Sequence, residues 1–210
     1  VDLEQAVGAL DDLDGRVVNL FRVLRERPDE LTRAIALTPY SRVEYRNSDE
    51  PTDDDLEAAR RFLVRVWMAH GGKLGSKSGW RQGWAGGSDG MRGSSARVWR
   101  GIPDRIAAIA DRLRDAMIDC RPALNVIAEW TNANDLIYAD PPYVRSTLQL
   151  GSNGTKNRNN ERPRYYAHEM TDDEHVALIE ALDRHPGPVL LSGYACPLYD
   201  ERLTHWTRLD

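Results

Sequence analysis

The stretch from Asp135 to Tyr143 constrains the chain more than any other, because it joins a β-favouring run to a turn that cannot continue it. Its first five residues are largely apolar and predict a buried strand. Asp140 follows, and then Pro141 and Pro142, which lack an amide hydrogen for a sheet and fix their own φ. We therefore expect a carboxylate, a stiff turn and an aromatic ring at the carboxyl end of a strand, where α/β proteins bind ligands.

An Asp-Pro-Pro-Tyr turn suits the recognition of an amino group on a flat ring. The prolines fix a backbone carbonyl beside the Asp140 carboxylate, so two acceptors can face the two hydrogens of one exocyclic amine. The Tyr143 ring can stack on a heterocycle, which is worth roughly 1–3 kcal/mol. The alternative interpretation is a proline turn that happens to follow a strand and has no such role.

The length of 210 residues predicts one compact domain with an inserted lobe. No apolar run is long enough for a membrane helix, and the two cysteines match no metal-binding spacing. We expect a cytoplasmic protein, a monomer, with no membrane partner and no metal site.

Positive charge is concentrated in residues 60–114, although the whole chain has a net charge of −5. This stretch holds 12 Lys and Arg, only 3 Asp and Glu, and four of the six tryptophans. Because basic and aromatic side chains together are typical of nucleic-acid binding, we interpret the loop at 71–96 as a nucleic-acid contact; a plain flexible linker is the alternative. The basic residues expected on the nucleic acid, which the family resemblance described below implies is DNA, are Lys73, Lys77, Arg81, Arg92, Arg97 and Arg100.

Helical spacing of apolar residues and capping signals predict the helices. They are expected at 16–27, at 28–37, from a Thr52 cap to Gly71, from Pro103 onward, and after a capping box of Thr171 and Glu174. Further strands are expected at 117–120 and 188–194.

Asp12 and Asp14 precede the first helix. Either acid can cap the helix, or it can accept hydrogen bonds from the ribose or amine of a nucleotide-like cofactor. Both interpretations stay open for Asp14, and for Asp12 we favour the cofactor role.

The quartet that begins at Asp140, with its preceding strand, resembles motif IV of the S-adenosylmethionine-dependent amino-methyltransferases. It is most similar to the Dam-like D12 class, which methylates N6 of adenine in DNA. The runs Asp-Asp-Leu-Asp-Gly at 11–15, Thr-Pro-Tyr-Ser-Arg at 38–42 and Arg-Pro-Ala-Leu at 121–124 resemble further segments of that family.

This resemblance implies an α/β fold, in which a Rossmann-like methyltransferase sheet carries a mostly helical inserted target-recognition lobe. Residues 1–27 and 116–210 would belong to the catalytic domain, and residues 28–115 would form the lobe. The family's glycine-rich cofactor loop should precede Asp12, where this chain has already begun. We therefore expect the chain to bind S-adenosylmethionine weakly.

The resemblance also implies the chemistry. A target adenine flips out of double-stranded DNA, and its amine donates to the Asp140 carboxylate and the Pro141 carbonyl while the Tyr143 ring stacks on the base. The implied catalytic residues are Asp140, Pro141, Pro142 and Tyr143, and the implied cofactor residues are Asp12, Asp14 and Asp140. Three alternatives stay open: a methyltransferase acting on a ribosomal RNA base, one acting on a protein amide, and a catalytically impaired DNA-binding remnant.

Overall fold

The computed structural model describes residues 8–70, 79–81, 95–148 and 166–209, and the chain divides into two compact units. Unit 1, Val1–Cys120, contains β1 (Ala9–Asp11), α1 (Gly15–Glu26), α2 (Pro28–Ala36), α3 (Arg42–Asn47), α4 (Asp55–Met68), α5 (Ser95–Arg100), α6 (Pro103–Leu113) and β2 (Met117–Asp119). Unit 2, Arg121–Asp210, contains α7 (Ala123–Glu129), β3 (Ile137–Ala139), α8 (Asp172–Arg184), β4 (Val189–Leu191) and α9 (Pro197–Arg202).

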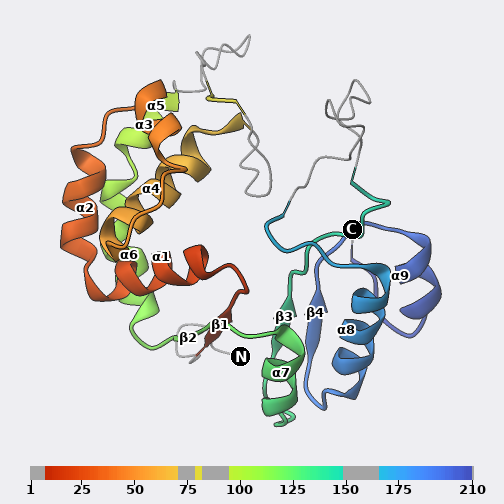
Figure 1. Ribbon diagram of the computed structural model, residues 1–210. Helices are drawn as coiled ribbons and strands as arrows, with labels where there is room; N and C mark the ends of the chain where they lie inside the picture. Colours follow the sequence, from red (N-terminus) through yellow and green to blue (C-terminus); the bar gives the residue numbers. More distant parts are fainter. Residues whose placement is uncertain (1–7, 71–78, 82–94, 149–165, 210) are drawn as a thin grey trace. The chain divides into compact units, whose positions relative to one another are not determined.

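The prediction of a Rossmann-like sheet is wrong. Helices predominate among the described residues, and the strands form two separate parallel pairs, β1 with β2 in unit 1 and β3 with β4 in unit 2 (Figure 1). The central side chains of β3 and β4 are exposed, Tyr138 by 64% and Leu190 by 49%. A central strand of a doubly wound sheet is buried on both faces, so the two expected buried strands are instead half-exposed.

The physical reason lies in the length of the strands and in the helices. Each strand is only three residues long, and an aspartate or a proline next to three of the four described strands limits further pairing. Most of the apolar surface is carried by amphipathic helices, which bury it against one another rather than against a sheet.

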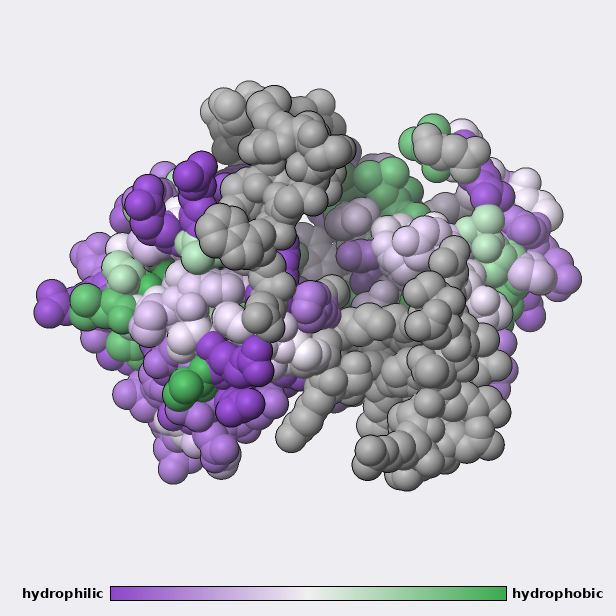
Figure 2. Space-filling model, turned by 90° about the horizontal axis from the view of Figure 1, so that it is seen from above, coloured by the Kyte–Doolittle hydropathy of each residue, from purple (hydrophilic) through white to green (hydrophobic). Residues whose placement is uncertain are grey.

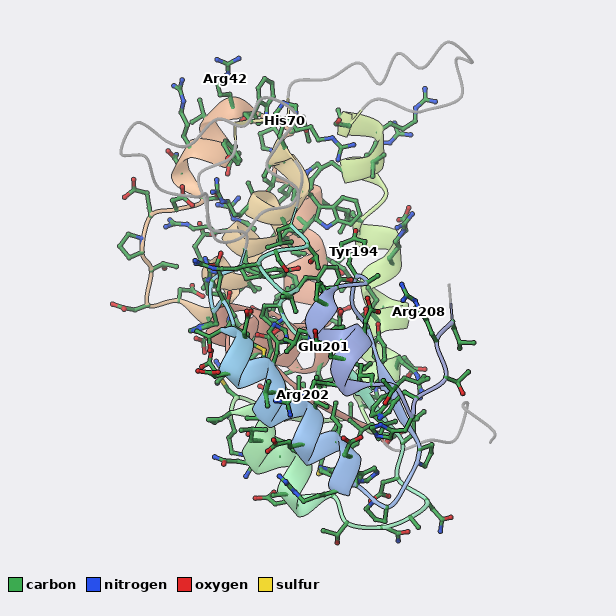
Figure 3. The ribbon with its side chains drawn as sticks, turned by 90° about the vertical axis from the view of Figure 1, so that its right-hand side faces the viewer. Arg42, His70, Tyr194, Glu201, Arg202 and Arg208 are labelled. Carbon is green, nitrogen blue, oxygen red and sulfur yellow. The ribbon has the colours of Figure 1, made fainter. Side chains whose placement is uncertain are left out.

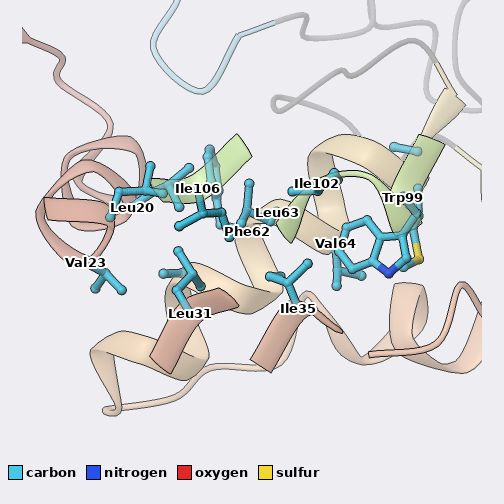
Figure 4. Packing of buried hydrophobic residues seen from close by; sticks show 14 of the residues in the cluster. Leu20, Val23, Leu31, Ile35, Phe62, Leu63, Val64, Trp99, Ile102 and Ile106 are labelled. Atoms are coloured by element: carbon cyan, nitrogen blue, oxygen red, sulfur yellow. The ribbon is translucent and has the colours of Figure 1, made fainter. Parts of the chain in front are cut away.

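The core of unit 1 is built by helices around α4, which contacts α1, α2 and α3, while α6 contacts α1 and α2. Figure 4 shows the side chains that fill the space between these helices. The labelled members of this core are Leu20, Val23, Leu31, Ile35, Phe62, Leu63, Val64, Trp99, Ile102 and Ile106, all less than a tenth exposed. No described helix is both long and apolar enough to cross a membrane.

The capping signals are confirmed in one helix and misplaced in another. Thr171 and Glu174 form the predicted capping box of α8. The cap of α4 is Asp54, whose carboxylate accepts from the amides of Leu56 at 2.8 Å and Glu57 at 3.2 Å. Thr52 instead accepts from the amide of Asp54 at 3.2 Å. The prediction of Thr52 as the cap is therefore wrong by two residues.

The core of unit 1 gives a matched pair of leucines for a stability test. Leu31 in α2 is fully buried, whereas Leu37, just after the same helix, is 72% exposed. Leu31→Ala should lower the free energy of unfolding by about 2–5 kcal/mol, because it removes buried methyl groups and leaves a cavity. Leu37→Ala should change it by less than about 0.5 kcal/mol. Urea unfolding of the full chain, followed by circular dichroism, measures both, and equal effects would contradict this packing.

Candidate active site

The pairing of β3 with β4 sets the position of the Asp-Pro-Pro-Tyr turn. Ala139 lies opposite Leu191, and the Ser192 amide donates to the Ala139 carbonyl at 2.8 Å. β3 ends at Ala139, as predicted from the acid and prolines that follow. Because the strands are parallel, their carboxyl ends meet at one edge, and Asp140 and Ser192 therefore leave the sheet side by side.

Packing of buried residues holds the turn in place. Pro141 is buried, and Val144, just beyond the turn, is 3% exposed. Val144 belongs to the small core of unit 2, together with Ile179 of α8 and Tyr199 of α9. The two prolines limit rotation within the turn, and the buried valine holds its far end, so the corner has little freedom to move.

Asp140 itself faces solvent. Its side chain is exposed, and no described residue forms a hydrogen bond or an ion pair with its carboxylate. Its charge is close enough to raise the pKa of Tyr166. An exposed carboxylate on a rigid corner is available to accept hydrogen bonds from a ligand.

Three tyrosines surround this corner, and we call them the tyrosine cluster: Tyr143, Tyr166 and Tyr194. The ring of Tyr143 lies 4.9 Å from that of Tyr194 and 6.4 Å from that of Tyr166, both edge to face. The Tyr143 hydroxyl also makes a weak contact with Ser192 Oγ at 3.4 Å. Tyr194 is 60% exposed, and Figure 3 labels it on unit 2. The cluster brings aromatic surface beside the Asp140 carboxylate.

The pKa of Tyr166 is raised, chiefly because its hydroxyl is partly buried, and further by the nearby Tyr143, Asp140 and Tyr194. A backbone hydrogen bond from Tyr143 acts in the opposite direction and lowers it. The site prediction missed Tyr166 and Tyr194. Tyr194 closes the strand expected at 188–194, and Tyr166 stands a few residues before the Thr171 capping box; only the fold brings their rings to Tyr143.

A buried histidine lies beneath the turn. His175 of α8 has no exposed surface, and its Nδ1 is 3.1 Å from the Tyr199 hydroxyl. Burial lowers the pKa of His175, while Asp172, Glu174 and the backbone of Pro142 act to raise it. The interaction with Pro142 is weak, since Nε2 has no hydrogen bond of normal geometry among the described residues. His175 thus links α8 and α9 directly under the Asp-Pro-Pro-Tyr corner.

The two predicted cofactor acids of unit 1 have local roles. Asp14 caps α1 by accepting from the Arg16 amide at 3.0 Å, and both of its oxygens receive hydrogen bonds from the Arg16 guanidinium. Asp12 is exposed and accepts from the Asp14 amide at 2.7 Å. The capping interpretation of Asp14 is therefore seen directly, and a cofactor role for either acid stays a prediction.

The expected DNA contacts are described only in part. Arg81, Arg97 and Arg100 are exposed in unit 1, the last two on α5. Lys73, Lys77 and Arg92 lie outside the described residues. Within the described ranges, no group of three or more His, Cys, Asp or Glu could hold a metal ion.

The comparisons with known proteins give no family for the chain. No protein-family model matches it, and no curated protein matches it either. The interpretation of the site therefore rests on the residues and the geometry described above.

The low pKa of His175 predicts an acid sensitivity of folding. The unfolded side chain has the ordinary pKa of 6.5 and the folded one a lower value, so below pH 6.5 the unfolded state binds more protons. This stability is therefore fully present above pH 6.5 and is lost progressively as the pH falls below 6.5 and through the lower pKa of the folded state. His175→Phe should reduce this loss, while costing about 1–3 kcal/mol at neutral pH because the Tyr199 hydroxyl loses its partner.

Urea unfolding of the full chain between pH 8 and pH 5 measures this effect. His168→Gln is the control, because it replaces an exposed histidine and leaves the buried contact between His175 and Tyr199 intact. A His175→Phe variant with the same acid sensitivity as the wild type would contradict the assignment.

Proposed function

We propose that this chain transfers a methyl group from S-adenosylmethionine to the N6 amine of an adenine in double-stranded DNA. The observation that carries the proposal is the corner of unit 2: an exposed Asp140 carboxylate, two consecutive prolines, and a tyrosine cluster at the carboxyl ends of two parallel strands. The resemblance of this quartet to motif IV of the amino-methyltransferases supports the same chemistry.

The corner offers acceptors of the right kind for an aromatic amine. The Asp140 carboxylate is exposed, and no described residue donates to the Pro141 carbonyl. In the proposed reaction each accepts one hydrogen of the N6 amine. This pairing opposes delocalisation of the nitrogen lone pair into the ring and directs it toward the methyl group, so the chain acts by positioning and electrostatics.

The tyrosine cluster would hold the base. A flipped adenine loses its stacking in the duplex, at a cost of a few kcal/mol. Contact with the Tyr143 ring offsets part of this cost, since base–aromatic stacking is worth roughly 1–3 kcal/mol. As the nitrogen forms its new bond to carbon it gives up one proton, which leaves to solvent past the exposed Asp140.

S-adenosylmethionine, when bound, supplies the methyl group from its sulfonium centre. Of the acids expected to hold it, Asp12 is exposed and fits a contact with a ribose hydroxyl or an amine. Asp14 fits less well, because both of its oxygens already accept from Arg16. Asp12 and Asp14 both belong to unit 1, and a cofactor contact at either acid stays a prediction.

Transfer of a tritiated methyl group to unmethylated duplex DNA tests the proposal. Asp140→Asn removes the charge with little change in shape, and we expect it to lower the rate by about 100-fold or more, as the loss of one preorganised polar contact does elsewhere. Asp173→Asn is the matched control, because this exposed acid of α8 makes the same charge change without being part of the Asp-Pro-Pro-Tyr turn.

The other substrates decide among the alternatives. Methylation of ribosomal RNA instead of DNA would favour the RNA-modifying enzyme, and methylation of protein would favour the amide-modifying one. DNA binding without any transfer, at saturating S-adenosylmethionine, would favour the DNA-binding remnant. Equal activity of Asp140→Asn and Asp173→Asn would contradict the role given to Asp140.

A further inference from the structure

Three segments that are distant in the sequence meet at the loop between α2 and α3. The Trp99 indole of α5 donates to the Thr38 carbonyl at 2.8 Å, and the Tyr40 hydroxyl donates to the Arg81 carbonyl at 2.7 Å. Trp80 forms an antiparallel bridge with Ala69 at the end of α4. These contacts gather α5, the end of α4 and residues 79–81 at one end of unit 1.

A cation and two aromatic rings are stacked at this place. The Arg42 guanidinium lies over the Trp80 ring, 5.1 Å from its centroid, and the Tyr40 ring lies 5.9 Å from Trp80 at a tilt of 39°. Stacking on an indole holds a guanidinium in one orientation, so less side-chain entropy is lost when it binds an anion. We call Tyr40, Arg42, Trp80 and Arg81 the Trp80 surface.

The Trp80 side chain also carries a buried polar group. The indole N–H of Trp80 is buried, and no described group accepts a hydrogen bond from it. An unpaired buried donor costs about 1–3 kcal/mol, and native structures rarely keep one without a reason.

Exposed arginines are numerous on the segments that form this end of unit 1. Arg42 and Arg81 are exposed, and so are Arg97 and Arg100 of α5. Glu44, the acidic residue of α3, forms an ion pair with Arg60 at 2.8 Å. Figure 3 labels Arg42 and His70 at the same end of unit 1, and Figure 2, which looks onto that end, shows a mainly hydrophilic surface there. A polyanion fits this end better than a membrane or an apolar protein face.

We propose that the Trp80 surface is a contact site for the phosphodiester backbone of DNA, with Arg42 held in place by Trp80 as its phosphate ligand. Naming DNA as the ligand rests on the proposed function. The stacked arginine and Arg81 supply the charge that phosphates need, and the tilted rings of Tyr40 and Trp80 supply planar surface for a sugar or base. An acidic peptide would use the charge but not the rings.

Fluorescence anisotropy of a labelled duplex, titrated with the full chain at several salt concentrations, tests this site. Arg42→Gln should weaken binding about tenfold and reduce the salt slope by about 1, because one phosphate contact is lost. Trp80→Leu removes no charge, yet it should also weaken binding severalfold, since Arg42 loses its support. Arg114→Gln, at the other end of α6 and 73% exposed, makes the same charge change as the control.

The outcomes separate this inference from the proposed function. Circular dichroism first checks that Arg42→Gln and Trp80→Leu are folded. If both variants then bind DNA as tightly as the wild type, and the wild type methylates DNA, the Trp80 surface is not the contact. If both variants lose affinity and the wild type transfers no methyl group, the surface stands and the proposed reaction fails. The wild type could also bind polyglutamate as tightly as DNA, with both variants losing that binding. This result would overturn the choice of a nucleic acid as the ligand.

Discussion

The carboxyl end of β3 is fixed by one constraint: two consecutive residues without amide hydrogens follow its last acid. Pro141 and Pro142 cannot extend the pairing with β4, so the ladder closes with the bond from Ser192 to Ala139. Asp140 must then leave the sheet at the point where the neighbouring strand also ends. Because the strand ends here, the Asp140 carboxylate is exposed beside Ser192. For the same reason, Tyr143 returns to this edge of the sheet.

The corner combines a buried support with an exposed chemical face. Beneath it, Val144 packs against α8 and α9, and His175 joins these helices through Tyr199. Above it, Asp140 and Tyr194 face solvent. In the proposed reaction, this support would hold the ligand-facing groups in place before the ligand arrives. In unit 1 the same logic applies to Arg42, which is held by an aromatic ring that is itself tied to the end of α4.

Local signals were enough to predict much of the secondary structure, but not the tertiary arrangement. The stop of β3 and the capping box of α8 follow from a few neighbouring residues, and both are confirmed. The predicted sheet has more strands than the two pairs described, because an apolar run indicates a preference for a strand but does not give the number of strands that pair with it. Helix α3 was not predicted, since six residues carry too short an apolar pattern. The contacts of Tyr166 and Tyr194 with Tyr143 depend on how distant segments pack, which spacing alone does not give.

The central claim is that paired acceptors beside a tyrosine cluster recognise an aromatic amine. Nuclear magnetic resonance of the tyrosine rings, in the full chain titrated with adenosine and separately with inosine, tests it most directly. The two nucleosides have similar shapes, but inosine carries a carbonyl oxygen where adenosine has its amine. The account predicts that adenosine shifts the ring signals of Tyr143, Tyr166 and Tyr194, and that inosine at equal concentration shifts them far less. Equal shifts with both nucleosides, or no shift with adenosine, would contradict it.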